Sequence, residues 1–82
     1  MTLDSIPHDV IAHIHSVDSQ DAHGLRLMEM GLVPGAQVRV VKSAPLGDPI
    51  QVCINNYHLA LRRTEARSIQ VILAESVSRP NP

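Results

Sequence analysis

The chain alternates between apolar and polar residues with a period of two over most of its length. Residues 10–17 (VIAHIHSV) carry Val10, Ala12 and Ile14 on one face, with Ile11 and two histidines at the intervening positions. Such alternation is typical of a half-buried strand. Four later segments repeat it, with these inward positions: Val38, Val40, Ile50, Val52, Ile54, Leu59, Leu61, Ile69 and Val71. The pattern therefore predicts five short strands.

One segment departs from this alternation and predicts a helix over residues 18–31. Asp18 or Ser19 can cap its start, and Gly31 is suited to the left-handed residue that ends a helix. Met30 is expected to be exposed. Apolar residues three and four positions apart are expected to form the core-facing stripe, namely Ala22, Leu25, Met28 and Leu32.

Short turns connect the predicted elements. Pro34-Gly35 is expected to start the second strand, and Asn55-Asn56 fits a tight hairpin, because Asn tolerates a positive φ. Thr2 and Thr64 are each expected to cap a single helical turn. Five short strands with short links favour a mainly β fold, a small antiparallel barrel with one α-helix inserted after the first strand. We expect one domain over residues 1–73 and a polar tail over 74–82.

Composition and charge exclude several classes of function. The 82 residues have one aromatic side chain, Tyr57, and a formal net charge of −1. Nucleic-acid binders depend on a positive excess and often on stacked aromatic rings, so we expect no nucleic-acid partner. No apolar stretch is long enough to span a membrane, and the N-terminus lacks a secretory pattern. The expectation is a soluble cytoplasmic domain.

The sequence offers no convincing catalytic group. Cys53 is the only cysteine, and it lies mid-strand with no neighbouring basic residue to lower its thiol pKa. The serines lie in turns or in the tail, and none stands in a G-x-S-x-G element. We therefore expect no enzyme activity and no required cofactor.

His13 and His15 are the candidate metal ligands. Two positions apart on a strand, they project from the same face at a separation of about 7 Å. A third ligand, from His8 or from a neighbouring molecule, would complete a site for Zn²⁺ or Fe²⁺. The alternative is that both rings are simply solvated.

Residues 45–48 form the most unusual turn in the chain. Pro45 restricts φ, Gly47 permits a reversal, and Asp48 can accept hydrogen bonds from nearby backbone N–H groups. Leu46 stands at the tip, where it either docks on a partner or folds back over the end of the barrel. A stiff loop with an apolar tip suits recognition, because little entropy is lost on docking.

Arg62, Arg63 and Arg67 are the only concentrated basic residues. On a strand, neighbouring residues point to opposite faces, so Arg62 and Arg63 are not expected to form one phosphate clamp. A basic rim beside the loop can instead steer an acidic protein partner.

Three motifs in order then resemble the FeoA family, small cytoplasmic accessory proteins of bacterial ferrous iron transport. They are MGLVPG at 30–35, APLGDP at 44–49, and LALRR with EA at 59–66, within a likeness that covers residues 10–72. The resemblance implies an SH3-like barrel with a helix inserted after the first strand. It also implies a regulatory or assembly role beside FeoB, the membrane ferrous iron transporter with a cytosolic G-protein domain.

Three functional hypotheses follow. The first is an accessory module that docks on this transporter through Pro45, Leu46, Gly47, Asp48, Arg62 and Arg63. The second is a metal-responsive module that takes up Fe²⁺ or Zn²⁺ at His13 and His15. The third is a detached dimerisation barrel like those of iron-dependent repressors, and self-association stays open in all three.

Overall fold

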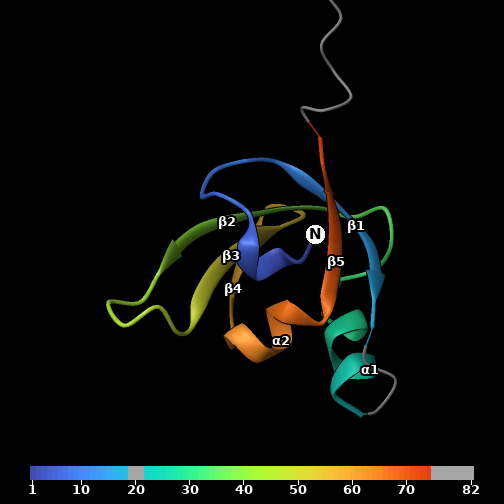
Figure 1. Ribbon diagram of the computed structural model, residues 1–82. Helices are drawn as coiled ribbons and strands as arrows, with labels where there is room; N and C mark the ends of the chain where they lie inside the picture. The colour runs from blue at the N-terminus through green and yellow to red at the C-terminus, as the bar shows by residue number, and fades with distance from the viewer. Residues whose placement is uncertain (19–21, 75–82) are drawn as a thin grey trace, which may run out of the picture.

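The computed structural model describes residues 1–18 and 22–74 and contains five strands and one α-helix of two turns (Figure 1). A short 3₁₀ helix, η1, precedes the first strand, and a five-residue helix, α2, precedes the last. In chain order the elements are η1 (Leu3–Ser5), β1 (Ala12–Val17), α1 (Ala22–Glu29), β2 (Gln37–Ser43), β3 (Ile50–Ile54), β4 (Tyr57–Leu61), α2 (Arg63–Arg67) and β5 (Ile69–Leu73).

The strands form one antiparallel sheet in the order β4-β3-β2-β1-β5. The predicted mainly β fold, with a helix inserted after the first strand, is confirmed. β4 and β5 therefore lie at the two ends of the sheet, and α2 connects them across the gap as the sheet curls round (Figure 1). The N-terminal residues lie beside β5, where Val71 N–H donates to the Met1 carbonyl at 2.8 Å.

The core lies inside the curled sheet and consists of the inward positions that the alternation predicted. Of the residues named above, Leu59 is half-buried, and the others in β2 to β5 are buried. Leu3 and Ile6 from the N-terminal segment and Ala66 from α2 close the ends. Asn55 and Asn56 have φ of 48° and 72°, which confirms the tight hairpin between β3 and β4.

The predicted core face of α1 is wrong. Leu27 is buried, whereas Leu25 is 56% exposed and Met28 is 36% exposed. Met30, which was expected to be exposed, packs partly buried against the core. The described part of α1 has only eight residues, so it contacts the core along a narrow line that Leu27 occupies together with Gly24. Leu32 is buried as predicted, because the chain turns inward after the helix.

That inward turn depends on Gly31. Its φ of +100° lies in the left-handed region, and a Cβ there would come within 3.1 Å of the Tyr57 hydroxyl. The same hydroxyl donates a hydrogen bond to the Met30 carbonyl, so the end of α1 is held against β4. The predicted stop at Gly31 agrees with this geometry. Of the two predicted caps, Ser19 lies outside the described residues, and the Asp18 carboxylate accepts from the Gln70 side chain at 2.9 Å.

The two predicted threonine caps also need correction. α2 begins at Arg63, with Arg62 as its N-cap, so Thr64 lies inside the helix. The Glu65 carboxylate accepts from the Arg62 N–H at 2.9 Å and caps the helix from its third residue. Thr2 does precede η1, but its hydroxyl donates to the Asp4 carboxylate at 2.6 Å instead of accepting from the backbone.

Candidate docking surface

The loop between β2 and β3 is closed by its own backbone. Gly47 N–H donates to the Ala44 carbonyl at 2.7 Å, and Ala44 N–H donates to the Pro49 carbonyl at 3.0 Å. These bonds hold the segment between them as a compact protrusion. Leu46 lies at its tip and is 97% exposed, so it does not fold back over the barrel. Because this side chain is not buried, it contributes almost nothing to the stability of the fold.

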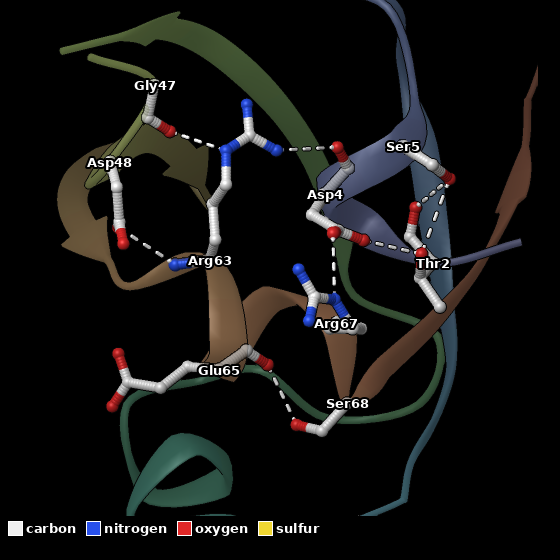
Figure 2. Close-up of polar contacts among 9 residues, drawn as sticks. All are labelled: Thr2, Asp4, Ser5, Gly47, Asp48, Arg63, Glu65, Arg67 and Ser68. Atoms are coloured by element: carbon white, nitrogen blue, oxygen red, sulfur yellow. Dashed lines mark hydrogen bonds and ion pairs between the residues drawn. The ribbon is translucent and has the colours of Figure 1, made fainter.

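Arg63 anchors the loop through hydrogen bonds. Figure 2 shows its guanidinium directed at two backbone carbonyls: Nε donates to Gly47, and one terminal nitrogen donates to Asp4 at 3.2 Å. Its backbone N–H donates to the Asp48 carboxylate at 3.0 Å. One residue at the start of α2 therefore fixes two consecutive loop residues and the N-terminal segment.

Gly47 allows the turn that brings its carbonyl to Arg63. Its φ of +89° is in the left-handed region, and the position of a Cβ would be 3.6 Å from Arg63 Nε. A side chain at this position would strain the backbone. The glycine is thus required by the backbone conformation of the loop turn, since a Cβ would make only an ordinary van der Waals contact with the arginine.

The three arginines are not gathered into one basic patch. Arg62 is exposed, Arg63 is half-buried against the loop, and Arg67 Nε donates to the Asp4 carboxylate at 3.3 Å (Figure 2). Arg63 is also the first residue of α2, not a strand residue as the sequence suggested. The strand geometry from which the absence of a phosphate clamp was predicted therefore does not apply to Arg63. Whether Arg62 and Arg63 contact a partner stays a prediction.

The surroundings of Asp4 shift the pKa of its carboxyl group. Partial burial favours the neutral form and raises the pKa, but hydrogen bonds from Thr2 and Arg67 and the charges of Arg67 and Arg63 outweigh it. The net effect lowers the pKa of Asp4 below its ordinary value. The Asp4 side chain is 12% exposed, so the charge interactions are only partly screened by water.

A shallow open groove of about 760 Å³ lies beside the loop, where α1, β4 and α2 meet. Two cations, Arg26 of α1 and Arg62, and two carboxylates, Asp48 and Glu65, line it. Sequence reasoning missed Arg26 and the small residue Ala60, because three separate elements bring these side chains together. In the sequence, Arg26 is recognisable only as a polar residue and Ala60 only as a small one, and neither property indicates a groove.

His13 and His15 are both exposed on β1, and the pairing of β1 with β5 is shifted between Ile14 and Ser16. His15 is therefore the extra residue of a β-bulge. Within residues 1–18 and 22–74, no three side chains of His, Cys, Asp or Glu are grouped so that they could hold a metal ion. His8 does not supply the third ligand, and it lies 3.2 Å from the Ser43 hydroxyl. A metal at His13 and His15 would need a ligand from outside the described residues, such as one from another molecule.

None of the helices in the described ranges combines the length and the apolarity that crossing a lipid bilayer requires. Cys53 is partly buried and has no disulfide partner.

Comparison with known proteins identifies relatives over nearly the whole chain. Residues 1–73 match the family model described as the FeoA domain. A curated relative from Porphyromonas gingivalis, named Fe(2+) transport protein A/Fe(2+) transporter FeoB fusion protein, is 38% identical over 71 residues. That alignment covers 87% of this chain but 8% of the relative, so the chain spans a small part of the fused protein.

Two solved structures show the same fold. FeoA from Chlorobium tepidum has a TM-score of 0.84 and 42% identity, with 90% of this chain and 70% of that chain covered. FeoA from Stenotrophomonas maltophilia has a TM-score of 0.78 and 37% identity, with 88% and 89% covered. The second was solved in complex with zinc and is described as a prokaryotic SH3 domain protein.

Proposed function

The chain belongs to the FeoA family, as its sequence motifs indicated, and we propose that it is a non-catalytic accessory protein of ferrous iron uptake. In this proposal it acts in the cytoplasm, where it docks on the cytosolic G-protein domain of a FeoB-type transporter. The fused relative supports the association, because joining two proteins in one chain keeps them at high effective concentration. Selection for such a fusion is expected where the two parts work together.

The observation that carries the docking proposal is the exposure of Leu46. It stands at the tip of a loop whose base is held by Arg63, so the apolar side chain is presented in a fixed position. A preorganised apolar residue can enter a pocket on a partner with little loss of conformational entropy. Arg62, which lines the groove together with Asp48 and Pro49 of the loop, is exposed and can contact the rim of the same interface.

Substitution of Leu46 tests this proposal. We expect Leu46→Ala to leave the thermal unfolding temperature unchanged, because the side chain has almost no intramolecular contacts. The same change should weaken binding to the transporter's cytosolic domain by at least about tenfold, the loss typical of a central apolar anchor. Pull-down and titration calorimetry, with the G-protein domain loaded with GDP or a GTP analogue, measure both affinity and nucleotide dependence.

Ile72→Ala is the matched control. Ile72 is 52% exposed on β5 and lies outside both the loop and the groove beside it, so its truncation should not affect docking. Equal affinities for wild type and Leu46→Ala would exclude the loop as the docking site. Failure of the wild-type chain to bind in either nucleotide state would exclude the proposed function.

A second candidate role is a response to divalent metal, which the zinc in the Stenotrophomonas maltophilia protein favours. Because the described residues offer no three-ligand site, His13 and His15 would bind Zn²⁺ or Fe²⁺ together with a ligand from a second molecule. Zinc should then raise the mass measured by light scattering in wild type and not in His13→Ala/His15→Ala. Identical masses for the two proteins in zinc would exclude this role.

A further inference from the structure

β4 is an edge strand with an unpaired side. Its pairing with β3 runs from Ile54↔Tyr57 to Ile50↔Leu61, and Asn55-Asn56 forms the two-residue turn. In such a hairpin the pair that closes the turn exchanges both hydrogen bonds, and every second pair does the same. The N–H and C=O groups of His58 and Ala60 therefore point away from β3.

The rest of this edge is already occupied. The next outward-facing N–H belongs to Arg62 and donates to Glu65, while the Arg62 carbonyl accepts from Glu65 and Ala66 at the start of α2. In the part of the chain that the structure describes, no bond to the outward backbone groups of His58 and Ala60 is present. These two residues leave a short stretch of edge that can accept another strand.

This stretch borders two hollows. The groove at α1 and α2 and a second hollow of about 250 Å³ over β2 and β3 share two lining residues, Pro49 and Ala60. Ala60 has a small, exposed side chain, so a second backbone can approach the strand without steric hindrance. Ala60 is the one residue of β4 that lines them, so the two hollows meet at this strand beside the base of the Leu46 loop.

The charges around the hollows favour an acidic occupant. Arg26, Arg62 and Lys42 line them, and the Arg26 side chain is 66% exposed, with only a 3.9 Å contact to Glu65. The two carboxylates that line the groove each accept a backbone N–H from this chain, Asp48 from Arg63 and Glu65 from Arg62. These carboxylates are therefore partly occupied by hydrogen bonds within the chain, whereas Arg26, Arg62 and Lys42 are exposed to solvent.

We propose that an extended acidic segment of the partner protein adds to the free edge of β4, bonds to the backbone of His58 and Ala60, and places carboxylates beside Arg62 and Arg26. This is strand addition, in which backbone hydrogen bonds supply affinity and flanking side chains supply selectivity. The inference rests on the proposed function, because the partner is the cytosolic domain of the transporter.

Amide hydrogen exchange by NMR tests the proposal on the intact chain with and without that domain. Exchange at His58 and Ala60 should slow by about tenfold or more in the complex, because their N–H groups gain acceptors. Tyr57 and Leu59 are internal controls, since their N–H groups already bond to β3, and their exchange should change less.

Charge reversal provides an independent measurement. Arg62→Glu should weaken binding by about tenfold at low ionic strength and reduce its salt dependence. Arg39→Glu is the matched control, because it makes the same charge change at a position that lines neither hollow. Arg39 lies on β2 and pairs with Asp9 at 3.1 Å. Its effect should stay within about twofold.

The outcomes separate the two proposals. A complex in which His58 and Ala60 exchange as fast as in the free chain, or in which Arg62→Glu and Arg39→Glu behave alike, overturns strand addition and leaves the accessory role intact. The absence of any complex with the wild-type chain overturns both.

Discussion

The Asp4 carboxylate connects η1 to α2 through hydrogen bonds from Thr2 and Arg67. Because its pKa is lowered in the folded state, folding favours the carboxylate form. The resulting stability is complete above the ordinary pKa of about 4 and is lost as the pH falls through the lowered value. We expect Asp4→Asn to reduce the free energy of unfolding by about 1–2 kcal/mol at pH 7. The difference from wild type should shrink below pH 4 in urea titrations.

Asp9→Asn is the control for this pH dependence. The Asp9 side chain is 72% exposed, and its pair with Arg39 is screened by water, so its loss should cost less than about 0.5 kcal/mol. Curves for wild type and Asp4→Asn that stay parallel down to pH 2.5 would show that the charge of Asp4 does not stabilise the fold.

Single residues were the least predictable part of the site. The sequence placed Leu46 at the loop tip but left open whether it folds back, and only the structure shows that it is 97% exposed. The role of Arg63 was not predictable, because its acceptors Asp4 and Gly47 lie 59 and 16 positions away. A long flexible side chain can reach many acceptors, and local sequence does not choose among them.

At the level of elements, the strands were predictable and α1 was not. A strand in a curled sheet has one solvent-exposed face and one face toward the core, so a period of two determines which residues are buried. In α1 the apolar residues surround the helix, with Leu27 inward and Leu25 and Met28 outward. A stripe chosen by spacing alone can therefore select the wrong side. Which line of a short helix meets the core depends on the sheet that it packs against.

The helix α2 shows a related limit. Thr64 is a good cap by residue type, yet the cap is Arg62, two residues earlier, because the Glu65 carboxylate accepts from the Arg62 N–H. The sequence signal for the earlier start is the glutamate three positions after Arg62. Residue type alone favours threonine as the cap. This shift does not change the order of the elements, because α2 lies between β4 and β5 in either case.

In the whole molecule, Arg63 joins three segments that are distant in sequence. It stands at the start of α2, bonds to Gly47 in the β2–β3 loop, and bonds to Asp4 in η1 (Figure 2). These segments lie near the gap between β4 and β5, where the sheet has no strand pairing of its own within the described residues. The arginine therefore joins the presentation of the loop to the closure of the fold.

Replacing Arg63 should consequently affect stability and the loop together. Arg63→Ala leaves the Gly47 and Asp4 carbonyls without a charged donor, which should reduce the free energy of unfolding by about 1.5–3 kcal/mol in urea titrations. Amides of residues 46–48 should exchange faster in the folded state, because the loop loses its anchor. Arg62→Ala is the matched control one residue away; its exposed side chain should change stability by less than about 0.5 kcal/mol. If Arg63→Ala loses stability but its loop amides exchange as in wild type, the loop is held by its backbone bonds alone, and the arginine stabilises only the junction of η1 and α2.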